Sequence, residues 1–196
     1  MTKIYSTREE WLTAATEEFR SVFAAKAKPI AASVRVTCGF PLTAKRSGSI
    51  GECWADTASA DKVMEIMISP TLADPYRVAD VLVHELCHTV AGAMNHGVNF
   101  KKVADAMHLV PSAGKAGYKA TSHGDAFKQA FQPIIDSLGE YPHGAMSIST
   151  HKVQGTRMLK AMCGACGYTI RLTSKWAGLG LPVCYCGGGM FTLGSI

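Results

Sequence analysis

Long apolar runs and dense charge are both missing from this chain of 196 residues. No stretch approaches the roughly 18 apolar residues that a membrane-spanning helix needs. The first residues also lack the apolar core of a secretory signal, so we expect a cytoplasmic protein with no membrane partner. Charged residues make up 18% and hydrophobic residues 47%, which excludes a disordered tail, a collagen-like chain and a coiled coil. The composition fits one core and one small additional module.

Acidic residues are absent from position 141 onwards. Five of the 20 Lys and Arg residues lie in this segment, and all 15 acidic residues precede it, so the net charge of +5 is concentrated here. A net positive charge of this size indicates a modestly basic module rather than a strongly basic arm.

Hydrophobic periodicity predicts alternating helical and extended segments. Helical spacing and capping residues predict helices over 7–27, 100–109 and 122–138. They also predict a helix that begins near Asp74 and ends at Gly92 or around Asn95–Gly97. Alternating, β-branched segments predict an antiparallel meander of strands over 32–38, 51–56 and 62–69. Turn residues predict a loop over 110–120. We expect three parts in the chain, a first domain over 1–140, a connecting segment over 141–155 and a cysteine module over 156–196.

The segment His84-Glu85-Leu86-Cys87-His88 is an H-E-x-x-H pattern inside an apolar helix. Positions i and i+4 share one helix face, so His84 and His88 can bind one Zn²⁺. Glu85 lies about 100° around the helix, where it can accept a proton from a zinc-bound water without being a ligand. Because buried His and Glu are costly without a partner, the apolar flanks favour a catalytic zinc site, and we expect Cys87 to be a small buried hydrophobe.

A third ligand is needed, and two histidines compete for the role. His96 and His123 each begin an H-G-x-x-F segment. The short turn after His88 could return His96 to the metal, so loop-closure cost favours His96. His123 could replace it if the segment 110–120 delivered the following helix to the site, and is otherwise expected to be exposed at that helix start.

Seven cysteines occur, four of them near the C-terminus, and in a cytoplasmic chain such clustering indicates metal binding. Cys163 and Cys166 form a C-x-x-C pair, and Cys184 and Cys186 a narrower C-x-C pair. The β-rich stretch between the pairs predicts a zinc ribbon with four thiolates around one structural Zn²⁺. Because C-x-C has a shorter reach, three Cys with a ligand such as His151 is an alternative.

The chain resembles the SprT-like (SprT/Spartan) zinc metallopeptidases, in particular compact phage and bacterial members with a C-terminal zinc ribbon. The resemblance extends over most of the chain and rests on the H-E-x-x-H pattern, the cysteine ribbon, and the segments Gly51–Trp54, Glu65–Pro70, His96–Phe100, Leu138–His143 and Gln154–Arg157.

The resemblance implies an α+β fold, with helices on a small antiparallel sheet in a minimal gluzincin-like zincin domain. It also implies that His96 is the third ligand and that His123 is a coincidental repeat. Peptide substrates would bind along a sheet edge. For a phage-encoded member, the compartment would be the host cytoplasm.

The expected function is that of a zinc-dependent endopeptidase, a monomer that acts on protein substrates. Because relatives act on DNA-bound proteins, DNA is a candidate partner, and Arg171, Lys175 and Trp176 are candidate contacts to phosphates and bases. The alternative is a non-catalytic nucleic-acid-binding adaptor that uses the ribbon. The oxyanion-stabilising group stays open among Tyr118, Tyr141, His143 and Arg157.

Overall fold

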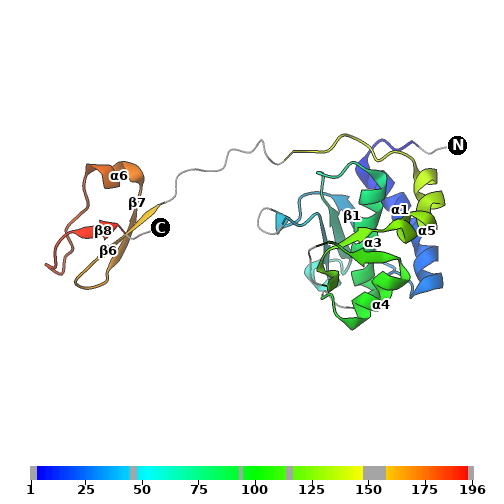
Figure 1. Cartoon of the computed structure of the whole chain (residues 1–196), viewed down its shortest axis with the longest axis horizontal. Coiled ribbons are helices and arrows are strands. Elements are labelled where there is room, and N and C mark those ends of the chain that lie inside the picture. Colours follow the sequence, from blue (N-terminus) through cyan, green and yellow to red (C-terminus); the bar gives the residue numbers. More distant parts are fainter. Residues whose placement is uncertain (1–3, 45–47, 93–94, 114–116, 148–157, 194–196) are drawn as a thin grey trace. The chain divides into compact units, whose positions relative to one another are not determined.

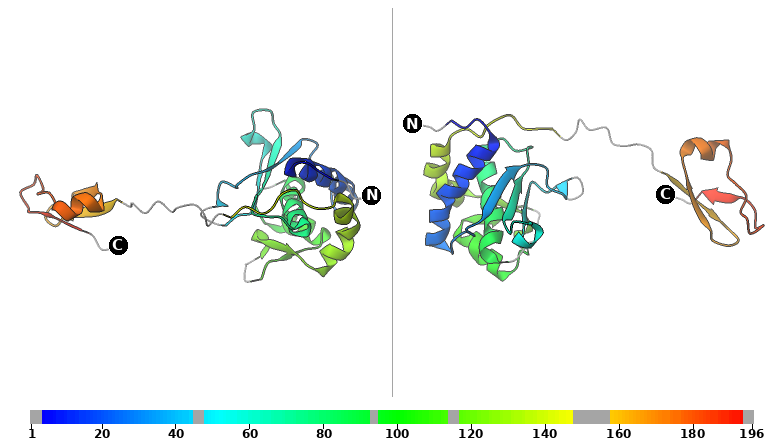
Figure 2. Two further views of the ribbon diagram at one scale, coloured as in Figure 1. Left: turned by 90° about the horizontal axis from the view of Figure 1, so that it is seen from above. Right: turned by 180° about the vertical axis from the view of Figure 1, so that it is seen from behind.

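The computed structural model describes residues 4–44, 48–92, 95–113, 117–147 and 158–193. It is of the α+β class and divides into two compact units, Met1–Ile148 and Ser149–Ile196. Figures 1 and 2 show helices and a sheet in the first unit and a small sheet in the second. No helix in the described ranges is long and apolar enough to cross a membrane.

The first unit contains a three-stranded sheet in the order β1-β3-β2. Its strands are β1 (Val34–Cys38), β2 (Gly51–Trp54) and β3 (Met64–Ile68). β2 pairs with β3 in antiparallel fashion, but β1 pairs with β3 in parallel. The expected antiparallel meander is therefore wrong. Alternation of residue types specifies the two faces of a strand but not its neighbours, and β3 takes the central place with its buried residues Ile66 and Ile68.

The first helix of this unit is α1 (Arg8–Lys26), which has a capping box between Thr7 and Glu10. α3 (Pro75–Ala91) packs against β2, β3 and α1, and α5 (Asp125–Leu138) packs against α1 and α3. In Figure 1, α1 and α5 lie side by side. The shared core is rich in large apolar side chains that are wholly buried, among them Trp11, Phe19, Phe23, Leu82, Leu86, Phe127 and Phe131.

A β-hairpin occupies the region where a loop and a helix start are expected. α4 (Val98–Ala106) ends three residues early, and Leu109 begins β4 (Leu109–Pro111). The short 3-10 turn η2 (Gly117–Lys119) precedes β5 (Thr121–His123), which pairs with β4 in antiparallel fashion. The strands are three residues each, too short for a period-two pattern to be recognised.

The segment after α5 is tied back onto α1. The Arg8 guanidinium donates to the carbonyls of Pro142 (3.1 Å), Gly144 (2.6 Å) and Pro70 (3.3 Å). Tyr141 is buried in the same region, with its ring edge-on to Trp11. Residues 139–146 therefore form a strap across the first unit.

The second unit contains the sheet β7-β6-β8 and one short helix. β6 (Leu159–Cys163) lies between β7 (Thr169–Leu172) and β8 (Phe191–Leu193), with antiparallel pairing on both sides. α6 (Ser174–Leu179) follows β7, so Lys175 and Trp176 are helical rather than extended. The buried core of this unit contains just four residues in the described part of the chain, Ala161, Cys163, Cys184 and Phe191.

Candidate metal centres

The first candidate centre is built on α3. Asp74 caps the helix by accepting from the backbone N–H of Arg77 at 2.8 Å, and Pro75 occupies the first turn. Gly92 ends the helix in the left-handed conformation, with φ of 69°, which glycine adopts without strain. The helix presents His84, Glu85 and His88 from a buried stretch. The predicted helix and its start at Asp74 are confirmed, and of its two predicted ends the structure shows the one at Gly92.

Three histidines meet at this centre. One ring nitrogen from each of His84, His88 and His96 lies within 4.8 Å of the others. The Nε2 atoms of His84 and His96 are 3.1 Å apart. His96 precedes α4, and the oxygen of the neighbouring Asn95 side chain accepts from Gly97 N at 3.0 Å. These three imidazoles could hold one metal ion.

Phe100 packs against the three imidazoles from the first turn of α4. Its ring centroid lies 4.9 Å from that of His84, 4.5 Å from that of His88 and 4.7 Å from that of His96. Phe100 is 1% exposed. The H-G-x-x-F segment therefore contributes both a histidine and the apolar residue against which the histidine rings pack.

Burial favours the neutral form of His84. His84 is buried, and desolvation lowers its pKa to about 3, with smaller contributions from His88 and His96. The pKa of His96 is also lowered, mainly by burial. Neutral imidazole is the form that binds metals, so these two rings are in the binding-competent state at neutral pH.

Glu85 is buried beside the backbone of β2. Burial and then the nearby Glu52 carboxylate raise the pKa of Glu85 to about 8. A methyl group added at Gly51 would lie 2.5 Å from Glu85 Oε1 and 2.7 Å from Val81 Cγ1. The missing side chain at Gly51 thus makes room for the Glu85 carboxyl group, a requirement that the motif did not reveal.

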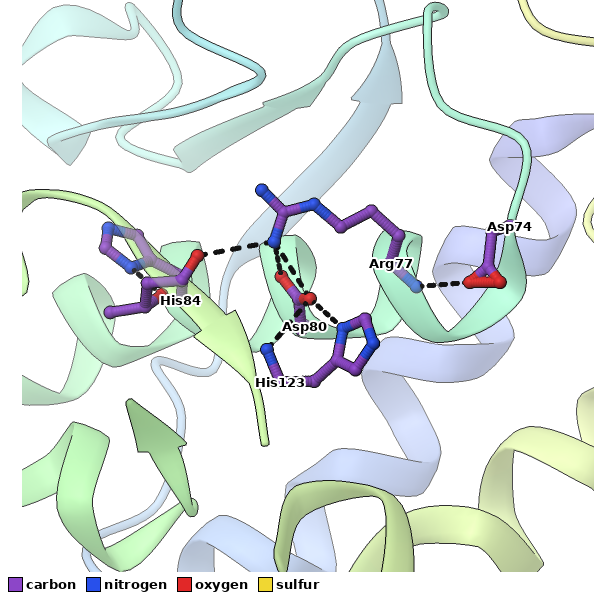
Figure 3. Close-up of polar contacts among 6 residues, drawn as sticks. Asp74, Arg77, Asp80, His84 and His123 are labelled. Atoms are coloured by element: carbon purple, nitrogen blue, oxygen red, sulfur yellow. Dashed lines mark hydrogen bonds and ion pairs between the residues drawn. The ribbon is translucent and has the colours of Figure 1, made fainter. Parts of the chain in front are cut away.

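A second layer of polar contacts, which no sequence pattern predicts, lies behind His84 (Figure 3). His84 Nδ1 lies 2.8 Å from the Thr121 hydroxyl oxygen on β5. His123, on the same strand, is outside the histidine cluster and pairs with the fully buried Asp80 instead. The expectation of an exposed helix-start residue at His123 is wrong, because position 123 lies in β5 and faces α3. No sequence motif marks Thr121 or Asp80.

The second candidate centre is the four-cysteine cluster. One sulfur from each of Cys163, Cys166, Cys184 and Cys186 lies within 4.8 Å of the others. The Sγ atoms of Cys163 and Cys186 are 3.6 Å apart, and those of Cys166 and Cys184 are 3.5 Å apart. Backbone N–H groups of Cys166 and Ala165 lower the pKa of Cys163 to about 6. The narrow C-x-C pair therefore reaches the cluster, which could hold a metal ion.

The candidates for the oxyanion-stabilising group, together with His151 and Cys87, lie in different parts of the chain. Tyr118, in η2, hydrogen-bonds Asp105, and Tyr141 is packed in the core of the first unit. His143 lies on the strap in a left-handed conformation, with φ of 66°. Arg157 and His151 lie outside the described residues. The buried position expected for Cys87 is confirmed.

The candidate nucleic-acid contacts lie on two elements of the second unit. Arg171 is exposed on β7, where Lys160 is its antiparallel partner on β6. Lys175 and Trp176 lie on α6, with the Lys175 ammonium 5.3 Å from the centre of the Trp176 ring. Trp176 is 58% exposed. The unit therefore has basic residues on its sheet and on α6, and an accessible aromatic ring on α6.

Comparisons of the chain with protein-family models, with curated proteins and with solved structures gave no match. The geometry of the two clusters and the chemistry of their donor atoms therefore carry the functional conclusion.

Proposed function

We propose that the chain is a zinc-dependent endopeptidase of the SprT-like type, with one catalytic and one structural Zn²⁺. The observation that carries the proposal is the convergence of His84, His88 and His96, two of which lie on the helix that also carries the buried Glu85. The resemblance of the sequence to that family supports the same function. So does the packing of the H-E-x-x-H helix α3 against β2 and β3 of a small sheet.

The donor atoms fit zinc at both centres. Three neutral imidazoles are a frequent protein contribution to a catalytic zinc site, which keeps one position open for water or substrate. Four thiolates are typical of a structural site, and a tetrahedron with Zn–S bonds near 2.3 Å has edges of roughly 3.8 Å. The sulfur separations of 3.5 and 3.6 Å are close to that edge length.

Within the proposed reaction, Glu85 is the general base and later the general acid. Zn²⁺ held by the three histidines would supply a Lewis acid that polarises the scissile carbonyl and lowers the pKa of water. Glu85 accepts the proton of the attacking water on a carboxylate oxygen and passes it to the leaving amine nitrogen. Because a nearby cation favours an ionised carboxylate, metal loading would oppose the raised pKa of Glu85.

The test combines metal content with proteolysis. We expect two zinc ions per wild-type chain and one per His96→Ala chain. Glu85→Gln should retain both zinc ions and lose at least about 100-fold in kcat on an unfolded protein substrate, since general base catalysis contributes about that much or more. Two zinc ions in His96→Ala, or full activity in Glu85→Gln, would contradict the proposal. A comparison of free and DNA-bound protein substrates tests whether DNA-associated or DNA-cross-linked proteins are the preferred targets.

A second candidate function is nucleic-acid binding by the ribbon, as an adaptor without catalysis. It is favoured by the absence of acidic residues from position 141 onwards and by the exposed Trp176. We expect Lys175→Ala to weaken single-stranded DNA binding by the full chain and to reduce its salt slope by about one. Lys101→Ala is the matched control, because Lys101 also lies over an aromatic ring, Tyr118, but in the first unit. Equal effects of the two variants would argue against a ribbon site.

A further inference from the structure

Strand β5 lies along α3 with a spacing that matches the helix. Asp80 and His84 are one helical turn apart on one face, about 6 Å along the axis. Thr121 and His123 share one face of the strand, about 6.7 Å apart. The spacing along the helix and the spacing along the strand are nearly equal, so each strand residue contacts one helix residue. Thr121 contacts His84, and His123 contacts Asp80.

Asp80 is the centre of the contacts that hold β5 in this place (Figure 3). Its carboxylate is wholly buried and accepts from Arg77 Nη1 at 2.7 and 2.9 Å. It also accepts from the backbone N–H of His123 at 3.2 Å and pairs with the His123 ring. Arg77 Nη1 in turn donates to the Thr121 carbonyl at 3.3 Å. A buried carboxylate is tolerated only when paired in this way, so displacing β5 would be costly.

The Thr121 hydroxyl is the hydrogen-bond partner of the His84 ring nitrogen Nδ1. For His84 to present an Nε2 lone pair to a metal, its proton must be on Nδ1. The Thr121 Oγ1 atom, 2.8 Å from Nδ1, is the acceptor for that proton. Thr121 is 6% exposed, so little water competes for this contact. Outer-shell hydrogen bonds of this kind orient the ligand ring and strengthen metal binding.

We propose that Asp80 is a positioning residue which, through Arg77 and β5, holds the Thr121 hydroxyl against His84 and so sets the tautomer and ring orientation of this metal ligand. The inference rests on the proposed function, since it concerns the same metal site. It gives His123 a role as the residue that fastens β5 to α3, in place of a ligand or a coincidental repeat.

The first experiment compares two substitutions at Thr121 in the full chain. Zn²⁺ affinity is measured by competition with a chromophoric chelator, and His96→Ala identifies the binding step that belongs to the cysteine cluster. We expect Thr121→Val to weaken the histidine site between about tenfold and 100-fold. Thr121→Ser, which restores the hydroxyl, should stay within about threefold of wild type.

The control is Thr16→Val, because Thr16 is also a buried threonine, bonded to the Leu12 carbonyl of α1. It should lower stability without changing Zn²⁺ affinity. Unchanged affinity in Thr121→Val, or equal losses in Thr121→Val and Thr16→Val, would overturn the inference. A wild type with no binding step beyond that of His96→Ala would overturn the metal site itself and the inference with it.

The second experiment tests the relay from Asp80. We expect Asp80→Asn to weaken Zn²⁺ binding at the histidine site about tenfold. The double variant with Thr121→Val should be no weaker than Thr121→Val alone, within about twofold, because both changes act through one hydroxyl group. Losses that multiply would mean that Asp80 acts on the site by another route. If Asp80→Asn does not fold, the same cycle is run with His123→Ala, which removes one of the contacts to β5.

Discussion

At the scale of single residues, Glu85 combines two conflicting requirements in its proposed role as general base. A general base must be ionised, yet burial in the metal-free chain raises the pKa of Glu85 to about 8. In the unfolded chain the ordinary pKa of this carboxyl group is 4.5. The folded metal-free state therefore holds a proton that the unfolded state releases between these two values. The contribution of Glu85 to the stability of this state should fall as the pH rises from about 4.5 to 8.

Glu85→Gln should remove this pH dependence, because the amide resembles the protonated acid at every pH. In chelator-treated protein we expect the variant to be more stable than wild type at pH 8, by as much as about 4 kcal/mol. The difference should shrink to below about 1 kcal/mol at pH 5. Denaturant unfolding followed by the fluorescence of the buried Trp11 provides the measurement. A difference that is constant with pH would contradict the burial of an ionisable Glu85.

Gly51 provides a second prediction at this scale. Alanine at this position would collide with the Glu85 carboxyl group and with Val81. We expect Gly51→Ala to lower kcat/KM at least about tenfold, since small displacements of a catalytic group are costly, while both metal ions are retained. Gly144→Ala is the control, because no atom lies within 4 Å of the added methyl group. Loss of the histidine-site metal in Gly51→Ala would instead indicate a wider collapse of the site.

At the scale of secondary-structure elements, the site depends on the placement of α3. Its Asp74 cap satisfies one backbone N–H of the first turn. Asp74→Ala should cost about 1 kcal/mol and lower Tm by about 2–4 °C, with Asp74→Ser close to wild type. Thermal unfolding of the zinc-loaded protein measures this. Equal Tm values for the two variants would mean that the cap contributes nothing.

The same scale shows what a sequence can predict. α3 was predictable because its cap, apolar periodicity and terminal glycine all indicate one helix, and its H-E-x-x-H pattern indicates two of the three histidines in the cluster. The hairpin β4–β5 was not predictable, because strands of three residues are too short to show an alternation of apolar and polar residues. Thr121 contacts His84 only because β5 packs against α3. Such long-range placement is decided by packing rather than by local sequence.

At the scale of the whole molecule, the two units differ in what holds them together. The first has a large apolar core, whereas two of the four buried residues in the described part of the second are cysteines of the cluster. A core of this size does not stabilise a domain without a metal or another crosslink. The second unit should therefore fold only when its cysteine cluster is loaded.

Cys184→Ser tests this dependence. We expect loss of one zinc ion per chain and loss of amide-exchange protection in β6 and β7, while protection in α1 and α3 is unchanged. Cys38→Ser is the control, since Cys38 is a half-buried cysteine of the first unit. Persistent protection in β6 of the Cys184→Ser protein would show that the second unit is stable without its full ligand set.

The strap of residues 139–146, which Arg8 holds, affects the order in which the first unit folds during synthesis. Arg8 is made among the first residues, but its acceptors Pro142 and Gly144 follow it by 134 and 136 positions. The Trp11 indole N–H likewise donates to the Gly139 carbonyl, and this bond cannot form until Gly139 has been synthesised. A ribosome must therefore release nearly the whole first unit before α1 can be locked in place. Nascent chains arrested before position 139 should remain sensitive to protease, even though the histidine cluster has already been translated.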